Sequence, residues 1–421
     1  MMPTTVDIML DGVGQPRPLR IGQAHVRPSQ QHGVQIRVDL STQDPELPLV
    51  VGQIDPGLGA YLGDQYPAGG RPTFGFLQDI SPDRWGRRLM DRRRAQQRRR
   101  GETTQPARLT VWDYLLGVDD RLRLGAVRLR EPGRGWIAAP RGSSVPPLTR
   151  LRILEAQARQ VEDDPDGELD EDVRLLMAPG SSLGGARPKA VVADETERTW
   201  IAKFPSKTDE DDMGLWEALT NALARACGIT VPDMLVDRVG DKHHLVRSLR
   251  FDRTPEGKRI HVASAMTLTG HQDGDGANTG VSYLELARVL TEHGAAPGRC
   301  LPELWRRIVF NMLVANADDH LRNHAFLLRP GQGWELAPAY DMNPVPDASG
   351  LALNVSEADN AIDLDLARSV AAHFRVNDAE ATATITRMRS VVRRWRQGAR
   401  AMGASAVACD RMAHAFALAD P

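Results

Sequence analysis

The chain has 421 residues, of which 41% are hydrophobic and 26% charged, an ordinary composition for a globular protein with two or three domains. The formal net charge is only -2, so no overall electrostatic bias indicates nucleic acid or a membrane as the partner. Three widely separated cysteines, Cys227, Cys300 and Cys409, have neither disulfide-framework nor zinc spacing. The opening MMPTTVDIMLDG lacks signal-peptide features and no apolar run has membrane-spanning length, so we expect a cytoplasmic protein with no membrane partner.

The first part of the chain consists of short alternating segments followed by helical patterns. Gly, Pro and Asp separate VDIML, HVRP, VQIRVDL and PLVVGQI (6–54), which predicts a small sheet or barrel. In FGFLQDISPDRWGRRLMDRRR (74–94) the period becomes helical, with Ser81 as the expected N-cap and Pro82 as the first helical residue. Eight arginines follow in 87–100 and favour a solvated helix face or loop, with polyanion binding as the alternative. The segment 109–131 predicts a helix, a turn and a strand that close a first domain, 1–132.

The remaining chain changes from mixed to helical patterns. A Gly-, Pro- and Ser-rich linker (132–150) precedes a predicted helix at 151–162 and strands near 189–193, 199–203 and 243–248. After residue 281, helical segments are predicted at 283–294, 303–317 and 381–403. We therefore expect an α+β protein with a second domain at 151–253 and a helical third domain at 254–421. The Gly- and Asp-rich segment 265–281 lacks EF-hand spacing and is predicted to be a mobile surface loop.

Two segments of the second domain carry residues suited to phosphate. In SSLGGARPKA (181–190), Gly184 and Gly185 let backbone N–H groups approach an anion, and Lys189 follows within reach of a phosphate. This is not a Walker A sequence, and an ordinary hairpin turn is the alternative. In WIAKFPSK (200–207), Lys203 occupies the strand position at which a kinase has its phosphate-orienting lysine, unless it faces solvent. Glu217, on a predicted helix, is either the ion-pair partner of Lys203 or an exposed helix residue.

The segment ANADDHLRNHAFLL (315–328) places adjacent aspartates between two apolar runs, where unpaired carboxylates would be costly. Asp318 and Asn323 have the D-x-x-x-x-N spacing of a kinase catalytic loop, in which the aspartate accepts the hydroxyl proton and the asparagine holds a metal ion. Asp341, in ELAPAYDMNPV (335–345), lies where a second metal ligand is expected. Two such oxygen donors suffice for Mg²⁺ when nucleotide phosphates complete its shell. The order of these motifs predicts an ATP- and Mg²⁺-dependent phosphotransferase, with a metal-binding network as the explanation for the buried charge.

The segments SSLGGARPKA, IAKFP, RFDR (250–253), ADDHLRNHAF and LAPAYDMNP resemble, in the same order, the motifs of the HipA-type toxin serine/threonine kinases. FGFLQDISPDRWGRRL and DYLLGVDDRLRLGAVRL resemble the small domain coupled to the kinase domain in that family, so the resemblance covers nearly the whole chain. It implies a protein-kinase-like bilobal fold with a small β-rich N-terminal domain, a kinase N-lobe and a mostly helical C-terminal lobe. It also implies transfer of the ATP γ-phosphate to a protein hydroxyl, with Mg²⁺ as cofactor.

The resemblance further implies roles for particular residues. Asp318 would be the catalytic base, and Asn323 and Asp341 the magnesium ligands and ATP contacts. The other ATP-binding residues would be Gly184, Gly185, Ala186, Arg187, Pro188, Lys189, Lys203, Leu249, Arg250, Phe251 and His320, with Leu249–Phe251 as the adenine hinge. Leu249 departs from the glutamate often found before RFDR in the family. Ser182, or the adjacent Ser181, would be autophosphorylated and thereby silence the enzyme.

Partners also follow from the resemblance. They are a HipB-like DNA-binding antitoxin, DNA indirectly through it, and a protein substrate such as an aminoacyl-tRNA synthetase, giving control of growth or translation. Two other classes stay open. A small-molecule phosphotransferase would usually carry HGDxxxxN where this chain has ADDHLRN. An inactive kinase-like binding module would act with a DNA-binding partner, and its arginines at 87–100 would contact phosphate backbones.

Overall fold

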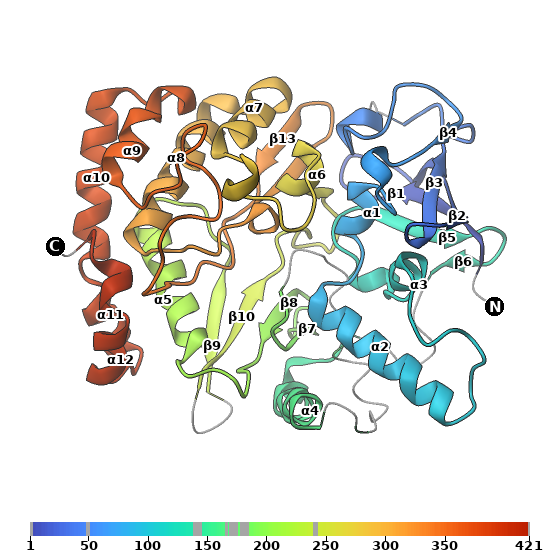
Figure 1. Ribbon diagram of the computed structural model, residues 1–421, viewed down its shortest axis with the longest axis horizontal. Coiled ribbons are helices and arrows are strands. Elements are labelled where there is room, and N and C mark those ends of the chain that lie inside the picture. The colour runs from blue at the N-terminus through green and yellow to red at the C-terminus, as the bar shows by residue number, and fades with distance from the viewer. Residues whose placement is uncertain are drawn as a thin grey trace. The chain divides into compact units, whose positions relative to one another are not determined.

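The computed structural model describes residues 3–47, 51–137, 145–164, 167, 176, 185–238 and 243–419 (Figure 1). The chain forms two compact units. The N-terminal unit comprises Met1–Thr208 and Leu249–Ala263, and the helical unit comprises Asp209–Ser248 and Ser264–Pro421. The three predicted domains stay a prediction, since closeness of Cα atoms does not show which segments fold on their own.

A six-stranded antiparallel sheet with the order β4-β3-β2-β1-β5-β6 opens the N-terminal unit. Its strands are β1 (Thr5–Leu10), β2 (Leu19–Ser29), β3 (Gly33–Asp39), β4 (Asp64–Gln65), β5 (Val127–Glu131) and β6 (Gly135–Trp136). Strand β1 is central and almost wholly buried, because it pairs with β2 on one side and β5 on the other. The predicted small sheet is confirmed, except that Val51–Gln53 form a 3₁₀ turn instead of a fourth strand. Residues 48–50 of that predicted strand lie outside the described residues.

The described part of this unit contains the helices α1 (Gly75–Asp79), α2 (Arg84–Arg99), α3 (Val111–Leu116) and α4 (Leu151–Asp163). The prediction that Ser81 caps the second helix was wrong. The Ser81 hydroxyl donates to the Leu77 carbonyl at 2.8 Å and so belongs to the end of α1. Asp83 is the N-cap of α2, because its Oδ1 accepts a hydrogen bond from the Gly86 backbone N–H at 2.8 Å.

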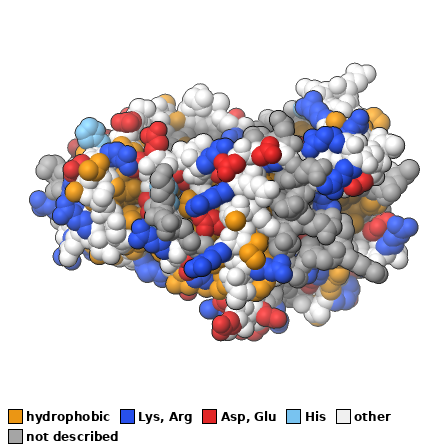
Figure 2. Space-filling model, turned by 90° about the horizontal axis from the view of Figure 1, so that it is seen from below, with side chains coloured by type: hydrophobic (Ala, Val, Ile, Leu, Met, Phe, Trp, Pro, Cys, Tyr) orange, Lys and Arg blue, Asp and Glu red, His pale blue; other side chains and the backbone are white. Residues whose placement is uncertain are grey.

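Only some of the arginines at 87–100 are exposed to solvent, so the prediction of a solvated helix face or loop was partly wrong. Arg94 is buried and donates to the Pro106 carbonyl at 3.1 Å. Arg92 donates to the carbonyls of Val161 and Asp164, both at 2.6 Å. The guanidinium groups thus donate to carbonyls at the C-terminal end of α4 and in the loop that follows α2. On the face drawn in Figure 2, the coloured Lys and Arg side chains are interspersed with Asp and Glu.

One antiparallel strand pair comes before Asp209, where the helical unit begins along the chain, and another comes after it. Strands β7 (Lys189–Ala193) and β8 (Thr199–Lys203) lie at the predicted positions, and they pair with Lys189 directly opposite Lys203. Strand β9 (Met234–Asp237) pairs with β10 (Leu245–Leu249). Helix α5 (Met213–Ala226) precedes β9 in the chain and carries a buried face along most of its length.

Helices dominate the helical unit, as the sequence predicts. Besides α5, they are α6 (Ala265–Thr269), α7 (Tyr283–His293), α8 (Pro297–Leu313), α9 (Leu364–Ser369), α10 (Asp378–Val392), α11 (Trp395–Ala401) and α12 (Ala406–Arg411). β11 (Val262–Ser264) lies at the boundary between the units, and β12 (Ala325–Arg329) pairs antiparallel with β13 (Gly333–Leu336). The long predicted helix 381–403 is divided, with α10 ending before α11 begins. Within the described ranges, no helix is both long enough and apolar enough to cross a membrane.

The segment 265–281 is not a plain surface loop, which corrects the prediction. It begins with α6, whose first four residues are buried, and contains a 3₁₀ turn at Ala277–Thr279. The backbone N–H of Ala277 donates to the Ala352 carbonyl at 2.8 Å, and Asp273 pairs with Arg322 of the catalytic-loop segment. The glycines and aspartates of 265–281 thus lie in turns of a segment that packs against the rest of the unit.

His261 should make the stability of the fold depend on pH. Its side chain is buried, and burial lowers its pKa to about 4. In the unfolded chain the pKa of histidine is about 6.5. Between these values only the unfolded state takes up the proton, so the free energy of unfolding should fall as the pH drops from 6.5 towards 4. The loss is at most about 3 kcal/mol.

Urea unfolding across that pH range, with His261→Gln beside the wild type, tests this expectation. The variant should have a flatter profile, whereas His32→Gln, at an exposed histidine, should retain the wild-type slope. An unchanged slope in His261→Gln would show that other groups cause the pH dependence.

Candidate active site

The catalytic-loop segment begins where α8 ends, and its two adjacent aspartates have opposite environments. Ala315 turns the chain with φ 46°, a left-handed conformation that costs a residue with a Cβ roughly 1–2 kcal/mol. After this turn the Asp318 side chain is 77% exposed, whereas Asp319 is only 4% exposed. The buried charge expected from the sequence therefore belongs to Asp319, and Asp318 is accessible to a substrate.

Three side chains from separate elements surround the Asp319 carboxylate. The Tyr283 hydroxyl, on α7, and the Asn311 amide, on α8, both donate to its Oδ2. His324 Nε2 lies 2.8 Å from Oδ1, and the His324 ring meets Tyr283 edge-on with centroids 5.5 Å apart. Protein donors thus account for the burial of Asp319, and the metal-binding network expected at Asn323 and Asp341 stays a prediction. The network ties the loop to two helices and to the start of β12.

A chain of amide side chains continues from this network to the segment that carries Asp341. Asn316 Nδ2 donates to Asn311 Oδ1 at 3.1 Å, and Asn316 Oδ1 accepts from the Asn343 backbone N–H at 3.2 Å. The Thr220 hydroxyl of α5 donates to the Met342 carbonyl. Asp341 is half-buried and has φ 57°, a conformation that non-glycine residues rarely adopt and that recurs at functional sites. Asp341 is therefore held by its neighbours in a specified orientation.

The remaining predicted residues of the loop lie close to Asp318. Asn323 Nδ2 donates to the Asp318 carbonyl at 2.8 Å, so its amide oxygen is the atom that would face a metal ion. The Tyr340 hydroxyl donates to the Arg322 carbonyl at 2.7 Å and joins this loop to the residue before Asp341. His320 Nε2 is 3.9 Å from Asp318 Oδ1. The structure thus brings the loop with Asp318, His320 and Asn323 beside the segment with Asp341.

These donors suit a magnesium ion better than a softer metal. Asn323 and Asp341 offer oxygen atoms, which Mg²⁺ prefers, and Mg²⁺ commonly uses one or two protein ligands with substrate phosphates. Among the residues that the structure describes, no group of three or more His, Cys, Asp and Glu side chains is arranged to hold a metal. A metal site here would therefore rely on nucleotide oxygens as well as on the protein.

The predicted phosphate loop lies in the N-terminal unit, and Lys189 differs from its expected role. Ser181, Ser182 and Gly184 lie outside the described residues. Lys189 is 4% exposed, and its ammonium donates to Asp83 at 2.6 Å and to the Gly185 carbonyl at 3.0 Å. Pro188 is buried, Ala186 is exposed, and Gly185 and Arg187 are half-buried. The Lys189 ammonium is therefore occupied by protein acceptors.

Lys203 and Glu217 lie in different units. Lys203 is half-buried at the end of β8, so it is not a fully solvent-facing lysine. Glu217 is 6% exposed on α5, and the alternative that it is an exposed helix residue was wrong. Its neighbours Trp216 and Thr220 are fully buried, which shows that this face of α5 points into the unit. The Lys203–Glu217 pair stays a prediction.

The predicted hinge contains a buried ionic cluster that the sequence analysis missed. Arg250 donates to both oxygens of Asp252 and to the carbonyls of Leu122 and Arg123. Its backbone N–H donates to the Thr199 carbonyl at 3.0 Å. Burial by itself would raise the pKa of Asp252, but Arg250 and Arg253 outweigh it and hold that pKa well below its usual range. The Arg250 side chain is thus structural, and the alternating charges of RFDR were the signal for an internal ion pair.

Half-buried Leu249 and Phe251 flank this cluster and stay the predicted adenine contacts. Because the Arg250 guanidinium is turned to the loop 122–125, only backbone atoms of Arg250 would be suited to a hinge contact. Gly125 N–H, which donates to Asp252 Oδ2 at 2.8 Å, completes the attachment of the RFDR segment to the small β-rich region.

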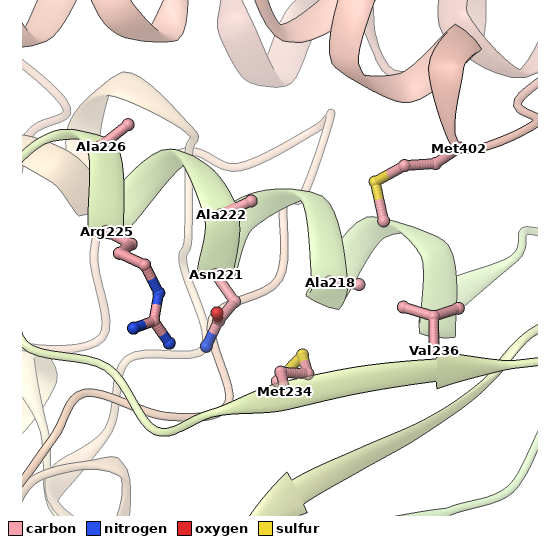
Figure 3. A pocket seen from close by; sticks show the side chains of 8 residues that line it. All are labelled: Ala218, Asn221, Ala222, Arg225, Ala226, Met234, Val236 and Met402. Carbon is pink, nitrogen blue, oxygen red and sulfur yellow. The ribbon is translucent and has the colours of Figure 1, made fainter.

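A separate groove of about 450 Å³ lies along α5 in the helical unit. Figure 3 shows Asn221 and Arg225 pointing from α5 towards β9, with Met402 approaching Ala218. The residues that line the groove are mostly small or apolar: Ala218, Asn221, Ala222, Arg225, Ala226, Met234, Val236 and Met402. None of the predicted site residues lines it, so we assign it no part in the chemistry.

The two adjacent aspartates should respond differently to substitution. Asp319→Ala should lower the free energy of unfolding by about 2–4 kcal/mol, because it leaves the buried Tyr283 hydroxyl and Asn311 amide without their acceptor. Asp318→Ala, at an exposed carboxylate, should change it by less than about 0.5 kcal/mol. Denaturant unfolding of the two variants measures both values. Equal losses would contradict the separation of a structural and an accessible aspartate.

Comparisons with known proteins agree with this geometry. A family model described as the HipA-like C-terminal domain matches residues 181–395, just over half of the chain. Y4dM of Sinorhizobium fredii, named as an inferred kinase, is 28% identical over an alignment of 244 positions that covers 53% of this chain and 56% of that protein. A Haemophilus influenzae protein, also named as an inferred kinase, is 29% identical over an alignment of 195 positions that covers 42% of this chain and 57% of that protein. The chain thus spans a little over half of the length of these curated relatives.

A solved structure extends the likeness to nearly the whole chain. A chain of the Shewanella oneidensis MR-1 toxin–antitoxin complex of HipA, HipB and operator DNA covers 98% of this chain and 95% of its own, with a TM-score of 0.63 and 17% identity. This likeness shows the fold, so the predicted α+β, protein-kinase-like fold is confirmed. The family model covers the glycine loop, the RFDR segment, the catalytic-loop segment and Asp341 together. The protein therefore belongs to the HipA-like family.

Proposed function

We propose that this protein is an ATP-dependent serine/threonine kinase of the HipA toxin type, which transfers the γ-phosphate of ATP to a protein hydroxyl. The observation that carries the proposal is the exposed carboxylate of Asp318. The next residue, Asp319, is buried and hydrogen-bonded, and the Asn323 amide donates to the Asp318 carbonyl. Such an arrangement leaves one carboxylate accessible while the loop itself is rigid. Membership in the HipA-like family and two relatives named as inferred kinases support it.

In the proposed mechanism, the protein positions two reactants and stabilises charge. Asn323 and Asp341 would hold Mg²⁺, which when bound neutralises the phosphate charge. Backbone amides near Gly185 would approach the phosphates, and Lys203 would orient the α- and β-phosphates. Leu249 and Phe251 would contact adenine. Asp318 would accept the proton of the serine or threonine hydroxyl as its oxygen bonds to the γ-phosphorus and ADP leaves.

Regulation and partners follow as further parts of the proposal. Autophosphorylation of Ser182 or Ser181 would add about -1.5 to -2 charges beside the glycine loop and repel the nucleotide phosphates. A HipB-like antitoxin that binds operator DNA is the proposed partner, supported by the HipA–HipB–DNA complex of Shewanella oneidensis. An aminoacyl-tRNA synthetase is the proposed class of substrate, through which the kinase would control growth or translation.

Substitution of the proposed base tests the chemistry directly. Asp318→Asn should lower the rate of phosphoryl transfer roughly 10²–10⁴-fold, because the amide cannot accept the hydroxyl proton. Binding of Mg·ATP, followed by calorimetry, should largely survive in this variant. Asp341→Ala should instead weaken that binding, since it removes a metal ligand. An undiminished rate in Asp318→Asn would refute the assignment.

Mass spectrometry distinguishes a protein kinase from a small-molecule phosphotransferase. The purified chain incubated with Mg·ATP should gain a phosphate on Ser182 or Ser181, and Asp318→Asn should gain none. A phosphate on the wild type would locate the self-silencing residue. Nucleotide binding without any protein phosphorylation would favour a phosphotransferase that acts on a metabolite, or a non-catalytic binding module.

A further inference from the structure

A buried ion pair joins the first turn of α2 to the glycine loop. Asp83 and Lys189 are 106 residues apart, yet their side chains meet at 2.6 Å, with exposed fractions of 0% and 5%. The same ammonium donates to the Gly185 carbonyl at 3.0 Å. One lysine thus connects a helix of the small β-rich region to the backbone at the end of the glycine loop.

The two carboxylate oxygens of Asp83 accept hydrogen bonds from different donors. Oδ1 accepts from the Gly86 N–H and caps α2, and Oδ2 accepts from the Lys189 ammonium. The cap fixes the orientation of the carboxylate, and fully buried Trp85 at the first turn leaves the helix start no freedom to move away. Asp83 therefore presents Oδ2 to Lys189 from a rigid support.

The register of β7 and β8 explains why Lys189 needs such a partner. Lys189 lies directly opposite Lys203, so both side chains project from the same face of the strand pair. Like charges in this arrangement repel each other, and a buried ammonium without a counter-charge is strongly unfavourable. Asp83 neutralises Lys189 and leaves Lys203 as the lysine with the expected phosphate-orienting role.

We propose that Asp83 and Lys189 form a positioning link that fixes the Gly185 end of the glycine loop for ATP binding. In this role Lys189 acts on the loop backbone instead of on phosphate, and Asp83 is a positioning residue outside the nucleotide site. The inference deepens the proposed function and rests on it where ATP binding is the readout.

Asp83→Asn separates the ion pair from the helix cap. Asparagine caps helices as well as aspartate does, so α2 should persist, while Lys189 loses its counter-charge and the loop loses its anchor. The dissociation constant for Mg·ATP, measured by calorimetry, should rise roughly 10- to 100-fold, as expected when a binding element is misplaced by about 1 Å. The turnover of the bound complex should change less. If Lys189 were instead a phosphate ligand for which Asp83 competes, the dissociation constant for Mg·ATP would fall in Asp83→Asn. A lower dissociation constant or an unchanged one would overturn the proposal.

Two further variants make the comparison specific. Asp363→Asn changes another aspartate N-cap, that of α9, which accepts from the Asp365 N–H, and should leave ATP binding unchanged. Lys189→Met removes the link from its other end and keeps the test open if Asp83→Asn does not fold. The double variant should bind Mg·ATP as weakly as Lys189→Met alone, since each substitution breaks the same link. Additive losses would show that the two residues act separately.

Hydrogen exchange of the backbone amides of Gly185, Ala186, Arg187 and Lys189 provides a readout that does not depend on ATP. Exchange there should be faster in Asp83→Asn than in the wild type without nucleotide, while α8 should keep its protection. Unchanged exchange would overturn the positioning link even if the kinase assignment held. A wild type that does not bind Mg·ATP would instead refute the proposed function, and the exchange result would still decide the link.

Discussion

The buried carboxylate of Asp319 is the constraint on which the candidate active site depends. A desolvated carboxylate must find donors, and here they come from Tyr283 on α7 and Asn311 on α8, while His324 Nε2, just before β12, lies 2.8 Å from the other carboxylate oxygen. These three elements are thereby fixed relative to the loop that lies between α8 and β12. The adjacent Asp318 is held through its carbonyl, which accepts from the Asn323 amide, while its carboxylate stays exposed. The rigidity of the loop comes from the aspartate that is not proposed to react.

The same principle recurs in the N-terminal unit. Asp83 connects α2 to the start of β7, and Asp252 connects the RFDR segment to the loop around residues 122–125. In each case a buried carboxylate accepts from both a backbone N–H and a cationic side chain. Because removal of one partner of a buried pair is much more costly than loss of an exposed pair, these aspartates define which segments must stay together. The segments of this unit that are proposed to bind the nucleotide are attached to this framework.

Two residues of the candidate active site have unfavourable backbone conformations. Ala315 and Asp341 both have positive φ values, and both flank the amide chain through Asn316 and Asn343. Ala315 turns the chain at the end of α8, and its carbonyl accepts from the Val345 N–H at 3.1 Å. Surrounding hydrogen bonds thus maintain two unfavourable backbone conformations, one before the catalytic-loop segment and one at Asp341, a proposed metal ligand. Such conformations persist only where neighbouring structure specifies them, which is consistent with a preorganised site.

The sequence by itself determined the strands of the small sheet, the strands at 189–193 and 199–203, and the order of motifs that places Asp318, Asn323 and Asp341 in one family pattern. These features depend on short-range periodicity and spacing, which a single sequence displays. It did not determine that Asp319 rather than Asp318 is buried, because a tight turn sends adjacent side chains in opposite directions. Nor did it reveal the Asp83–Lys189 pair, the internal role of Arg250 or the burial of Glu217. Each of these depends on segments distant along the chain that meet only when the backbone has folded, so only the tertiary structure decided them.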